Sequence, residues 1–388
     1  MATHARFLPG NRLTLLNSGA EFFPALLTAI DEARHEVHLE SYIFEDDRTG
    51  RDVAGALMAA ARRGVDVRVL VDGFGAPAFS TTLMPALTDA GVMALVYRPE
   101  YARFKLRRHR LRRLHRKLAV IDGEIAFVGG INIIDDLNTA DQSPGRYDYA
   151  VRVEGPVLLP IRQTMRRLWE VLVWVNFKRR YRLAPVEKST TAPCGEQQAA
   201  FLVRDNIRHR RDIEQAYLAA IAGARDSILI ANAYFLPGRR FRRALNKAAQ
   251  RGVQVSILLQ GRIEYRLLHY ATQALYDKLL KSGIRIFEYQ NSFLHAKVAV
   301  IDEQWATVGS SNIDPFSLLL SREANLVVLD GKFAEELRRS LGQAMQAGAS
   351  ELSPQHWQRL PWYSRLLRSA SYNLLRIAIG FTGYGGKH

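Results

Sequence analysis

Short apolar runs alternate with longer segments of mixed apolar and polar residues along most of the chain. The short runs are rich in Val, Ile and Leu, a composition typical of buried β-strands, whereas the longer segments have the patterning of helices. The predicted strands lie at 36–44, 65–71, 92–97, 117–121, 125–129, 227–236, 253–259, 284–289, 297–301 and 306–309. The predicted helices lie at 22–33, 53–63, 82–90, 161–180, 212–224, 241–251 and 270–281. Their alternation predicts an α/β fold with helices on both faces of a sheet.

The same order of elements occurs twice, because the two halves of the chain align with each other. Residues 38–44 correspond to 230–236, and residues 62–71 correspond to 250–259. The period of about 190 residues is too long for a solenoid, whose repeats span about 20–50 residues. The sequence therefore predicts one duplicated domain.

The sequence is therefore divided into four segments: two domains, a linker and a tail. The first domain is expected at 1–183 and the second at 200–350. A polar, turn-rich linker at 184–199 separates them, and a basic tail occupies 351–388.

Length and charge narrow the class of protein. The chain has 388 residues, of which 48% are hydrophobic, enough for two domains with a hydrophobic core. Its formal net charge of +16 implies an anionic partner, namely nucleic acid, phospholipid headgroups or a phosphorylated substrate. The single cysteine, Cys194, excludes an intramolecular disulfide. No apolar run approaches the roughly 20 residues of a membrane span, and 1–12 does not resemble a signal peptide, so any membrane role is expected at the surface.

One motif occurs in both halves with the same spacing. The first copy is His115-Arg116-Lys117, then Asp122, then Gly129-Gly130-Ile131-Asn132. The second copy is His295-Ala296-Lys297, then Asp302, then Gly309-Ser310-Ser311-Asn312. In each copy the lysine follows the histidine by two residues and the aspartate follows it by seven. Side chains two apart on a strand share a face, so both can reach one phosphate. Two copies predict one active site built from two half-sites.

These residue types suit the transfer of a phosphodiester. One imidazole can attack phosphorus and form a phosphohistidine, and a second, protonated imidazole can protonate the leaving alcohol. Lys117 and Lys297 can hold the equatorial phosphoryl oxygens, and Asn132 and Asn312 can donate hydrogen bonds to them. Because two lysines already supply positive charge, the reaction is expected to need no metal and no cofactor.

Each histidine also needs a group that fixes its tautomer. Asp148 and Glu323 occupy matching positions after the two motifs and are the candidates, although the sequence leaves open which carboxylate orients which histidine. Asp122 and Asp302 fall in the turns between the paired motif strands. For these two aspartates, anchoring of the turn is favoured over contact with the substrate.

The paired motifs resemble the HKD motifs of the phospholipase D superfamily, over about residues 10–345. More narrowly, the chain is similar to bacterial cardiolipin synthases of the B type, at 39–44, 71–75, 115–117, 148–156, 230–235 and 306–315. The resemblance implies two pseudo-symmetric phospholipase D-like domains, each a mixed sheet flanked by helices, with the active site at their interface. It implies the catalytic set His115, Lys117, Asp122, His295, Lys297 and Asp302. It further implies transfer of a phosphatidyl group from one phosphatidylglycerol to another, with His115 as the nucleophile and His295 as the general acid.

Two basic segments bear on the partner. Residues 103–117 carry nine Arg or Lys and no acid, and this strip can dock on anionic headgroups or track the phosphates of a nucleic acid. The end of the chain, 357–388, combines Trp, Tyr and Leu with Arg and contains no acid. That composition suits an interfacial helix, and the alternative is a helix packed on the domain.

Three classes of function remain for this sequence. The first is a transferase peripheral to the cytoplasmic face of a bacterial cell membrane, with anionic phospholipid as its partner and no nucleic acid. The second is a nuclease or phosphodiesterase of the same superfamily, for which the acid-free aromatic tail has little use. The third is a binding protein without catalysis, which the two intact motifs argue against.

Overall fold

The computed structural model describes residues 5–99, 112–136, 145–183, 192–205, 208–314, 321–358 and 361–379. Most of the basic strip, 103–111, and Arg359 of the tail lie outside these residues. Among the residues described, no helix is both long enough and apolar enough to span a bilayer.

The described residues of the first half form seven strands and four helices. The strands are β1 (Leu8–Asn17), β2 (Glu36–Ser41), β3 (Asp66–Asp72), β4 (Met93–Tyr97), β5 (Lys117–Ile121), β6 (Ile125–Gly129) and β7 (Tyr149–Glu154). The helices are α1 (Ser18–Glu32), α2 (Arg48–Arg62), α3 (Leu83–Asp89) and α4 (Leu158–Val175), followed by a short 3-10 turn at Arg179–Tyr181. The strands lie side by side in the order β1-β7-β6-β5-β2-β3-β4.

The second half repeats this arrangement. Its strands are β8 (Gln197–Arg204), β9 (Ser227–Asn232), β10 (Gln254–Gln260), β11 (Arg285–Tyr289), β12 (Lys297–Ile301), β13 (Trp305–Gly309), β14 (Glu323–Leu329) and β15 (Ala349–Glu351). Its helices are α5 (Asp212–Gly223), α6 (Arg239–Gln250), α7 (Arg266–Gln273), α8 (Tyr276–Lys281), α10 (Gly331–Gly348), α11 (Pro354–Gln358) and α12 (Trp362–Ile379). The order β8-β14-β13-β12-β9-β10-β11 matches that of the first half, which confirms the predicted duplication.

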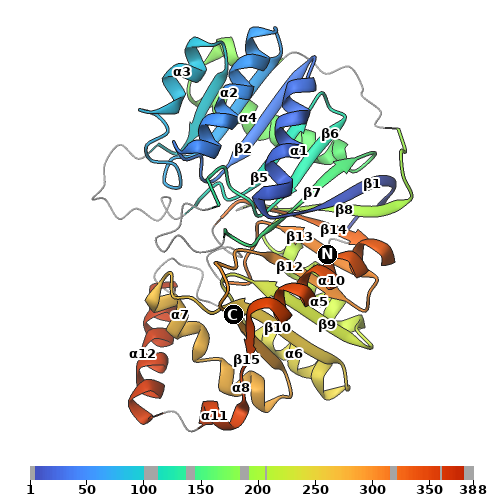
Figure 1. Cartoon of the computed structure of the whole chain (residues 1–388), viewed down its shortest axis with the longest axis vertical. Helices are drawn as coiled ribbons and strands as arrows, with labels where there is room; N and C mark the ends of the chain where they lie inside the picture. Colours follow the sequence, from blue (N-terminus) through green and yellow to red (C-terminus); the bar gives the residue numbers. More distant parts are fainter. Residues whose placement is uncertain are drawn as a thin grey trace.

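The two sheets join edge to edge into one 15-stranded sheet (Figure 1). β1 and β8 meet antiparallel at the junction, where Leu8 pairs with Ala199 and Asn11 with Gln197. The segment 197–199, predicted as the end of the linker, therefore belongs to β8 rather than to a connection. Neither β1 nor β8 was predicted from the sequence, and the rest of the predicted linker is 184–191, which lies outside the described residues, and 192–196, which precedes β8.

Among the described residues, three large apolar cores hold the helices on this sheet, and a smaller cluster around Trp169 packs the end of α4 against β3 and β4. One core packs α1, α2 and α3 against the first half, and another packs α5 to α8 against the second. A third core combines Ile161 of α4 and Leu337 of α10 with strands of both halves, such as Val151 of β7 and Leu326 of β14. Because this third core crosses the boundary, the halves form a single packed body around their shared edge.

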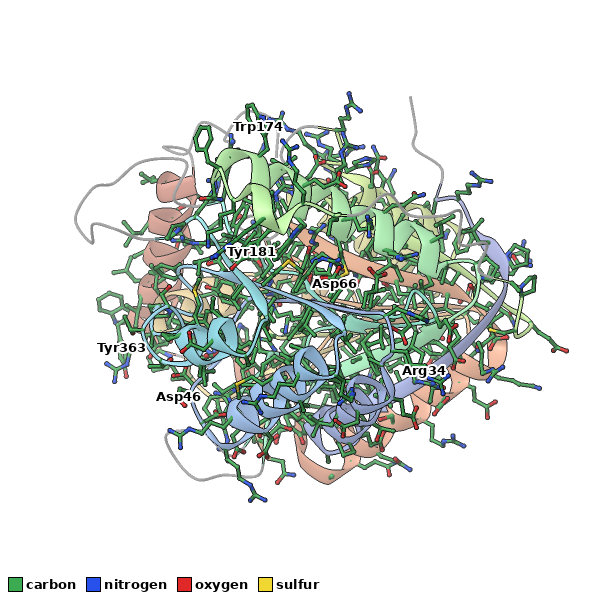
Figure 2. The ribbon with its side chains drawn as sticks, turned by 90° about the horizontal axis from the view of Figure 1, so that it is seen from above. Arg34, Asp46, Asp66, Trp174, Tyr181 and Tyr363 are labelled. Atoms are coloured by element: carbon green, nitrogen blue, oxygen red, sulfur yellow. The ribbon has the colours of Figure 1, made fainter. Side chains whose placement is uncertain are left out.

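The tail packs on the second half, as one of the two alternatives predicted, but only one face of its helix is buried. Leu375 of α12 is buried in the core of the second half, and Trp357 packs against that core from α11. Its ring lies 5.0 Å from that of Tyr276, centroid to centroid. Another face of α12 is exposed, and Figure 2 shows Tyr363 pointing away from the body of the protein.

Candidate active site

The two hairpins that carry the motifs lie at equivalent positions in the sheet. β5 with β6 and β12 with β13 pair antiparallel, and β5 and β12 are buried along their whole length. Both first strands begin at the motif lysine, so His115 and His295 precede the strand instead of lying on it as predicted. Central, fully buried strands fix both lysines, while the histidines lie in the segments that enter the sheet.

Those entering segments pair across the boundary between the halves. Leu114 forms a bridge with Arg322, and Tyr147 forms a bridge with Leu294. The His115 amide donates to the Arg322 carbonyl at 2.9 Å, and the His295 amide donates to the Tyr147 carbonyl at 2.8 Å. The backbone of each histidine is therefore hydrogen-bonded to the other half of the chain. Its partner there is the residue just before a carboxylate, Arg322 before Glu323 or Tyr147 before Asp148.

The carboxylates consequently orient the histidines in a crossed arrangement. Nδ1 of His115 lies 3.0 Å from Oε2 of Glu323, and Nδ1 of His295 lies 2.6 Å from Oδ2 of Asp148. A neutral imidazole that donates from Nδ1 keeps its lone pair on Nε2. Each carboxylate therefore lies beside the histidine of the other half's motif: Glu323 beside His115, and Asp148 beside His295. Neither half alone holds a complete set.

The two lysines are buried between these pairs. Nζ of Lys297 lies 3.3 Å from Oδ2 of Asp148, and its side chain is fully buried. Nζ of Lys117 donates to the carbonyl of His115 at 2.8 Å and lies 5.1 Å from the centre of the Tyr42 ring. Each lysine therefore contacts the histidine of its own motif, Lys117 at the backbone carbonyl and Lys297 at Nδ1, 2.6 Å away.

Burial and mutual repulsion lower the pKa values of these groups. Desolvation lowers the pKa of Lys117 to about 7, with the nearby charge of Lys297 as the next cause. Desolvation and Lys297 lower the pKa of His295 to about 3, and desolvation also lowers that of His115 despite the opposing effect of Glu323. Each histidine is also affected by the lysine of the other half, so the half-sites lie within electrostatic range of each other.

Asp148 remains an anion in this setting. Burial alone would raise the pKa of its carboxyl group, but Lys297 and His295 together hold that pKa below its ordinary value. In the substrate-free protein the site therefore pairs a neutral His295 imidazole with a charged Asp148 carboxylate. A neutral Nε2 is the form that attacks phosphorus.

Asp122 and Asp302 lie at the far ends of their strands and hold turns. The carboxylate of Asp122 accepts backbone hydrogen bonds from Arg34, His35 and Glu36, each at 2.8 Å. Asp302 accepts the equivalent bonds from the amides at 225–227, at 2.7 to 2.9 Å. Both aspartates have positive φ angles, of 53° and 50°, which Asp tolerates better than most residues. These contacts match the turn-anchoring interpretation.

The motif asparagines lie near the end of the second strand of each hairpin. The amide oxygen of Asn132 accepts from the amide of Ile43 at 3.2 Å. The amide oxygen of Asn312 is buried and has no hydrogen-bond partner among the residues described. Rotating that amide by 180° would present its NH₂ group instead, which is the form that donates to a phosphoryl oxygen.

The glycines of the motifs make room for protein rather than for a ligand. A Cβ on Gly130 would lie 2.4 Å from Oδ1 of Asp148, so only glycine admits that carboxylate. Ser310 occupies the equivalent position in the second half, and its hydroxyl donates to Oε2 of Glu323 at 2.5 Å. Glu323 therefore accepts a side-chain hydrogen bond that Gly130 cannot supply to Asp148. This is the main chemical difference between the two half-sites.

Three further groups around the histidines were not assigned a role by the sequence analysis. Tyr42 stacks edge-on against His115 with ring centres 4.7 Å apart. Asp72 accepts from the amide of Leu114 at 2.7 Å, and Gln260 accepts from the amide of Leu294 at 3.1 Å. Asp72 and Gln260 end β3 and β10, so they fix the segments that carry the histidines. The internal repeat could have identified Asp72 and Gln260, because they directly follow the aligned segments 62–71 and 250–259.

No cluster of three or more His, Cys, Asp or Glu side chains suited to a metal ion occurs within the described part of the chain. The arrangement provides two imidazoles whose side chains are 16% and 21% exposed, and two buried lysines. These side chains are suited to phosphoryl transfer through a covalent bond to histidine.

Comparisons with known proteins agree with this class. The sequence model described as "Cardiolipin synthase, PLD-like domain" matches residues 26–169 and 217–345, one stretch in each half. Cardiolipin synthase B of Escherichia coli K12 is 38% identical over 389 aligned residues, covering 98% of this chain and 91% of that protein. A probable cardiolipin synthase of Bacillus subtilis strain 168 is 30% identical and covers 91% of this chain and 69% of its own. The chain belongs to the cardiolipin synthase family with phospholipase D-like domains, and is an enzyme of the phosphatidyltransferase class.

Solved structures support the fold. The crystal structure of phosphatidylserine synthase from Haemophilus influenzae Rd KW20 superposes with a TM-score of 0.71 at 15% identity, covering 98% of this chain and 97% of that one. Polyphosphate kinase from Porphyromonas gingivalis gives a TM-score of 0.58 and covers 95% of this chain. The predicted fold class and family resemblance are thereby confirmed.

Proposed function

We propose that the protein transfers a phosphatidyl group from one phosphatidylglycerol to another, giving cardiolipin and glycerol. The observation that carries the proposal is the crossed pair of histidines, each with Nδ1 held by a carboxylate of the other half. Family membership supports the lipid substrate. It also favours the transferase over the nuclease of the same superfamily.

In the first step, Nε2 of His115 attacks phosphorus and the bond to the glycerol headgroup breaks. His295 gives its Nε2 proton to the departing glycerol oxygen, and a phosphatidyl-histidine remains. In the second step, neutral His295 takes the proton from a headgroup hydroxyl of a second phosphatidylglycerol. That oxygen attacks phosphorus, the P–N bond breaks and cardiolipin leaves. Lys117, Lys297 and the two motif asparagines hold the phosphoryl oxygens in both steps.

The different partners of the histidines support this assignment of roles. Asp148 lies only 2.6 Å from Nδ1 of His295 and is held as an anion, so it can stabilise an imidazolium. Glu323 lies farther from Nδ1 of His115, at 3.0 Å. His295 is neutral at pH 7 in the substrate-free site, so the bound phosphodiester anion must raise its pKa before it acts as the acid.

The location follows from the substrate. Phosphatidylglycerol resides in a membrane, and the strongly basic chain suits the anionic cytoplasmic surface of a bacterial cell. We therefore propose a peripheral protein on that face, with anionic phospholipid rather than nucleic acid as its partner.

Product analysis tests this proposal. Purified protein incubated with phosphatidylglycerol vesicles should yield cardiolipin and glycerol in equal amounts, with little phosphatidic acid. Phosphatidic acid as the main product would show that water is the acceptor and would contradict the transferase. Cleavage of single-stranded DNA at a comparable rate would favour the nuclease.

Activity should persist after chelation, because Lys117 and Lys297 supply the charge that a metal provides elsewhere. We expect turnover with excess EDTA to stay within twofold of the untreated rate. Loss of turnover with EDTA, followed by recovery with Mg²⁺, would show that the metal-free mechanism is wrong.

The pKa of Lys117 sets an alkaline limit on kcat/KM. Lys117 is charged below its pKa of about 7 and neutral above it, so capture of an anionic phosphodiester should weaken as pH rises through that value. In Lys117→Arg the guanidinium stays charged, so the alkaline limb should move up by at least two pH units. Lys332→Arg, at an exposed position of α10, is the matched control. A limb that stays near pH 7 in Lys117→Arg would exclude Lys117 as its cause.

A further inference from the structure

The exposed side of α12 is apolar, the reverse of a helix on a water-soluble domain. Its buried face, with Ser371 and Leu375, packs against the second half. Its outward face carries six large apolar residues that are each at least half exposed: Trp362, Tyr363, Leu366, Leu367, Leu374 and Ile377. A soluble helix turns such residues toward the core. An exposed apolar face of this size marks a site of contact with a protein or a membrane.

Beside α12 lies a large cavity, which we call the basic pocket. Its volume is about 870 Å³, it is open to solvent, and residues of α6, α7, α8, α11 and α12 line it. α6 contributes Arg239 and Arg242, α8 contributes Lys278 and Lys281, and α12 contributes three arginines. The one acid in its lining, Asp277, pairs with Lys281 at 2.8 Å.

This lining is suited to anions. Seven cations that share one cavity repel one another, and a bound anion relieves that repulsion. The Nε of Arg242 is buried and has no hydrogen-bond partner among the residues described, so one donor there remains to be satisfied. The volume falls within the range of roughly 300–1,000 Å³ typical of ligand sites. A glycerophosphate headgroup fits such a space.

We propose that the basic pocket binds the phosphate groups of anionic membrane phospholipids as a second lipid site, distinct from the catalytic one. The apolar face of α12 inserts at the boundary between headgroups and acyl chains, to a depth of about 5–10 Å. A helix is about 10–12 Å across, so the flank that borders the pocket then lies at the level of the phosphates. Headgroups can enter the pocket from the side while the helix remains in the membrane.

The pocket is separate from the catalytic residues but is connected to their surroundings through α7. None of the motif residues lines it. α7 connects the two places, because α12 packs on it and Tyr265, just before it, contacts Tyr234 and lies within electrostatic range of Tyr42. Ile263, Tyr265 and Leu267 are exposed at this end of α7. A membrane held at α12 would thus extend toward His115 through an apolar surface. The inference rests on the proposed membrane setting, not on phosphatidyl transfer.

Vesicle flotation tests the pocket without any need for turnover. The test variant is Arg239→Gln/Lys278→Gln, which removes two exposed pocket cations. The control, Arg34→Gln/Arg62→Gln, removes the same charge from exposed positions on the first half, where Figure 2 shows Arg34 far from α12. With phosphatidylcholine vesicles that contain phosphatidylglycerol, the test variant should bind about 25-fold more weakly than wild type, since each of the two cations contributes about fivefold. The control should lose less than threefold.

Other arms separate the alternatives. Leu366→Ser/Ile377→Ser should also weaken binding, and unlike the charge variant it should do so at high salt. Equal losses in the test and control variants would mean that only net charge matters and would overturn the site. Tight binding of glycerol 3-phosphate without vesicles, lost in the test variant, would show a soluble phosphate ligand and overturn the lipid assignment. If wild type makes no cardiolipin yet the flotation pattern holds, the proposed function fails and the second lipid site stands.

Discussion

Replacing His115 or His295 by Ala should lower the rate of phosphatidyl transfer by about 10⁴-fold or more. Each histidine supplies one half of the proton and phosphoryl transfers, and no other imidazole takes part in the crossed pairs. Because the two act as a unit, the double variant should be scarcely slower than either single one. Transfer of radiolabelled phosphatidylglycerol into cardiolipin measures all three rates.

The matched control for these variants is His35→Ala. His35 is exposed, and only its backbone amide takes part in the contact with Asp122. This variant should retain full activity, and all proteins should show the same thermal unfolding temperature within a few degrees. A His295→Ala enzyme that keeps more than a hundredth of the wild-type rate would contradict its role as the acid and base.

Replacing Glu323 by Gln should lower the rate by about 10²- to 10⁴-fold, and Asp148→Asn should do the same. A carboxamide can donate to Nδ1 and so favours the tautomer whose Nε2 carries hydrogen and cannot attack phosphorus. The change lies 208 residues from His115 in sequence, yet 3.0 Å away in space. The variant thus tests the crossed architecture directly.

Glu335→Gln on α10 removes the same charge from an exposed position and should leave the rate unchanged. The KM for phosphatidylglycerol should change little in Glu323→Gln, because the carboxylate acts through the histidine rather than on the substrate. A Glu323→Gln rate within fivefold of wild type would show that the tautomer of His115 is fixed by something else.

Local patterns in the sequence predicted the catalytic hairpins well. The strands at 117–121, 125–129 and 297–301 have the predicted bounds, since each is a short apolar run between turn residues and is buried along all or nearly all of its length. The duplication gave the equivalent elements of both halves. The segment 270–281, predicted as one helix, is instead divided into α7 and α8.

What local patterns could not show is how the halves meet. β1 and β8 join the sheets and were not predicted. Two further strands were also not predicted: β7, which follows Asp148, and β14, which begins at Glu323. The crossing depends on bridges such as Leu114 with Arg322, between residues far apart in the chain. No periodicity encodes such a pairing, so Asp148 and Glu323 were identified as candidates without their partners. The apolar outward face of α12 likewise became visible only when its buried face was known.

The central claim is that a covalent intermediate forms on a histidine held by the opposite half. Acid-sensitive phosphohistidine should therefore be trapped by rapid denaturation during turnover and mapped by mass spectrometry under alkaline conditions. A phosphatidyl group is expected on the peptide that contains His115, and it should be absent from Glu323→Gln. A label on the peptide that contains His295 would reverse the two roles, and the absence of any labelled peptide during steady turnover would contradict the covalent mechanism.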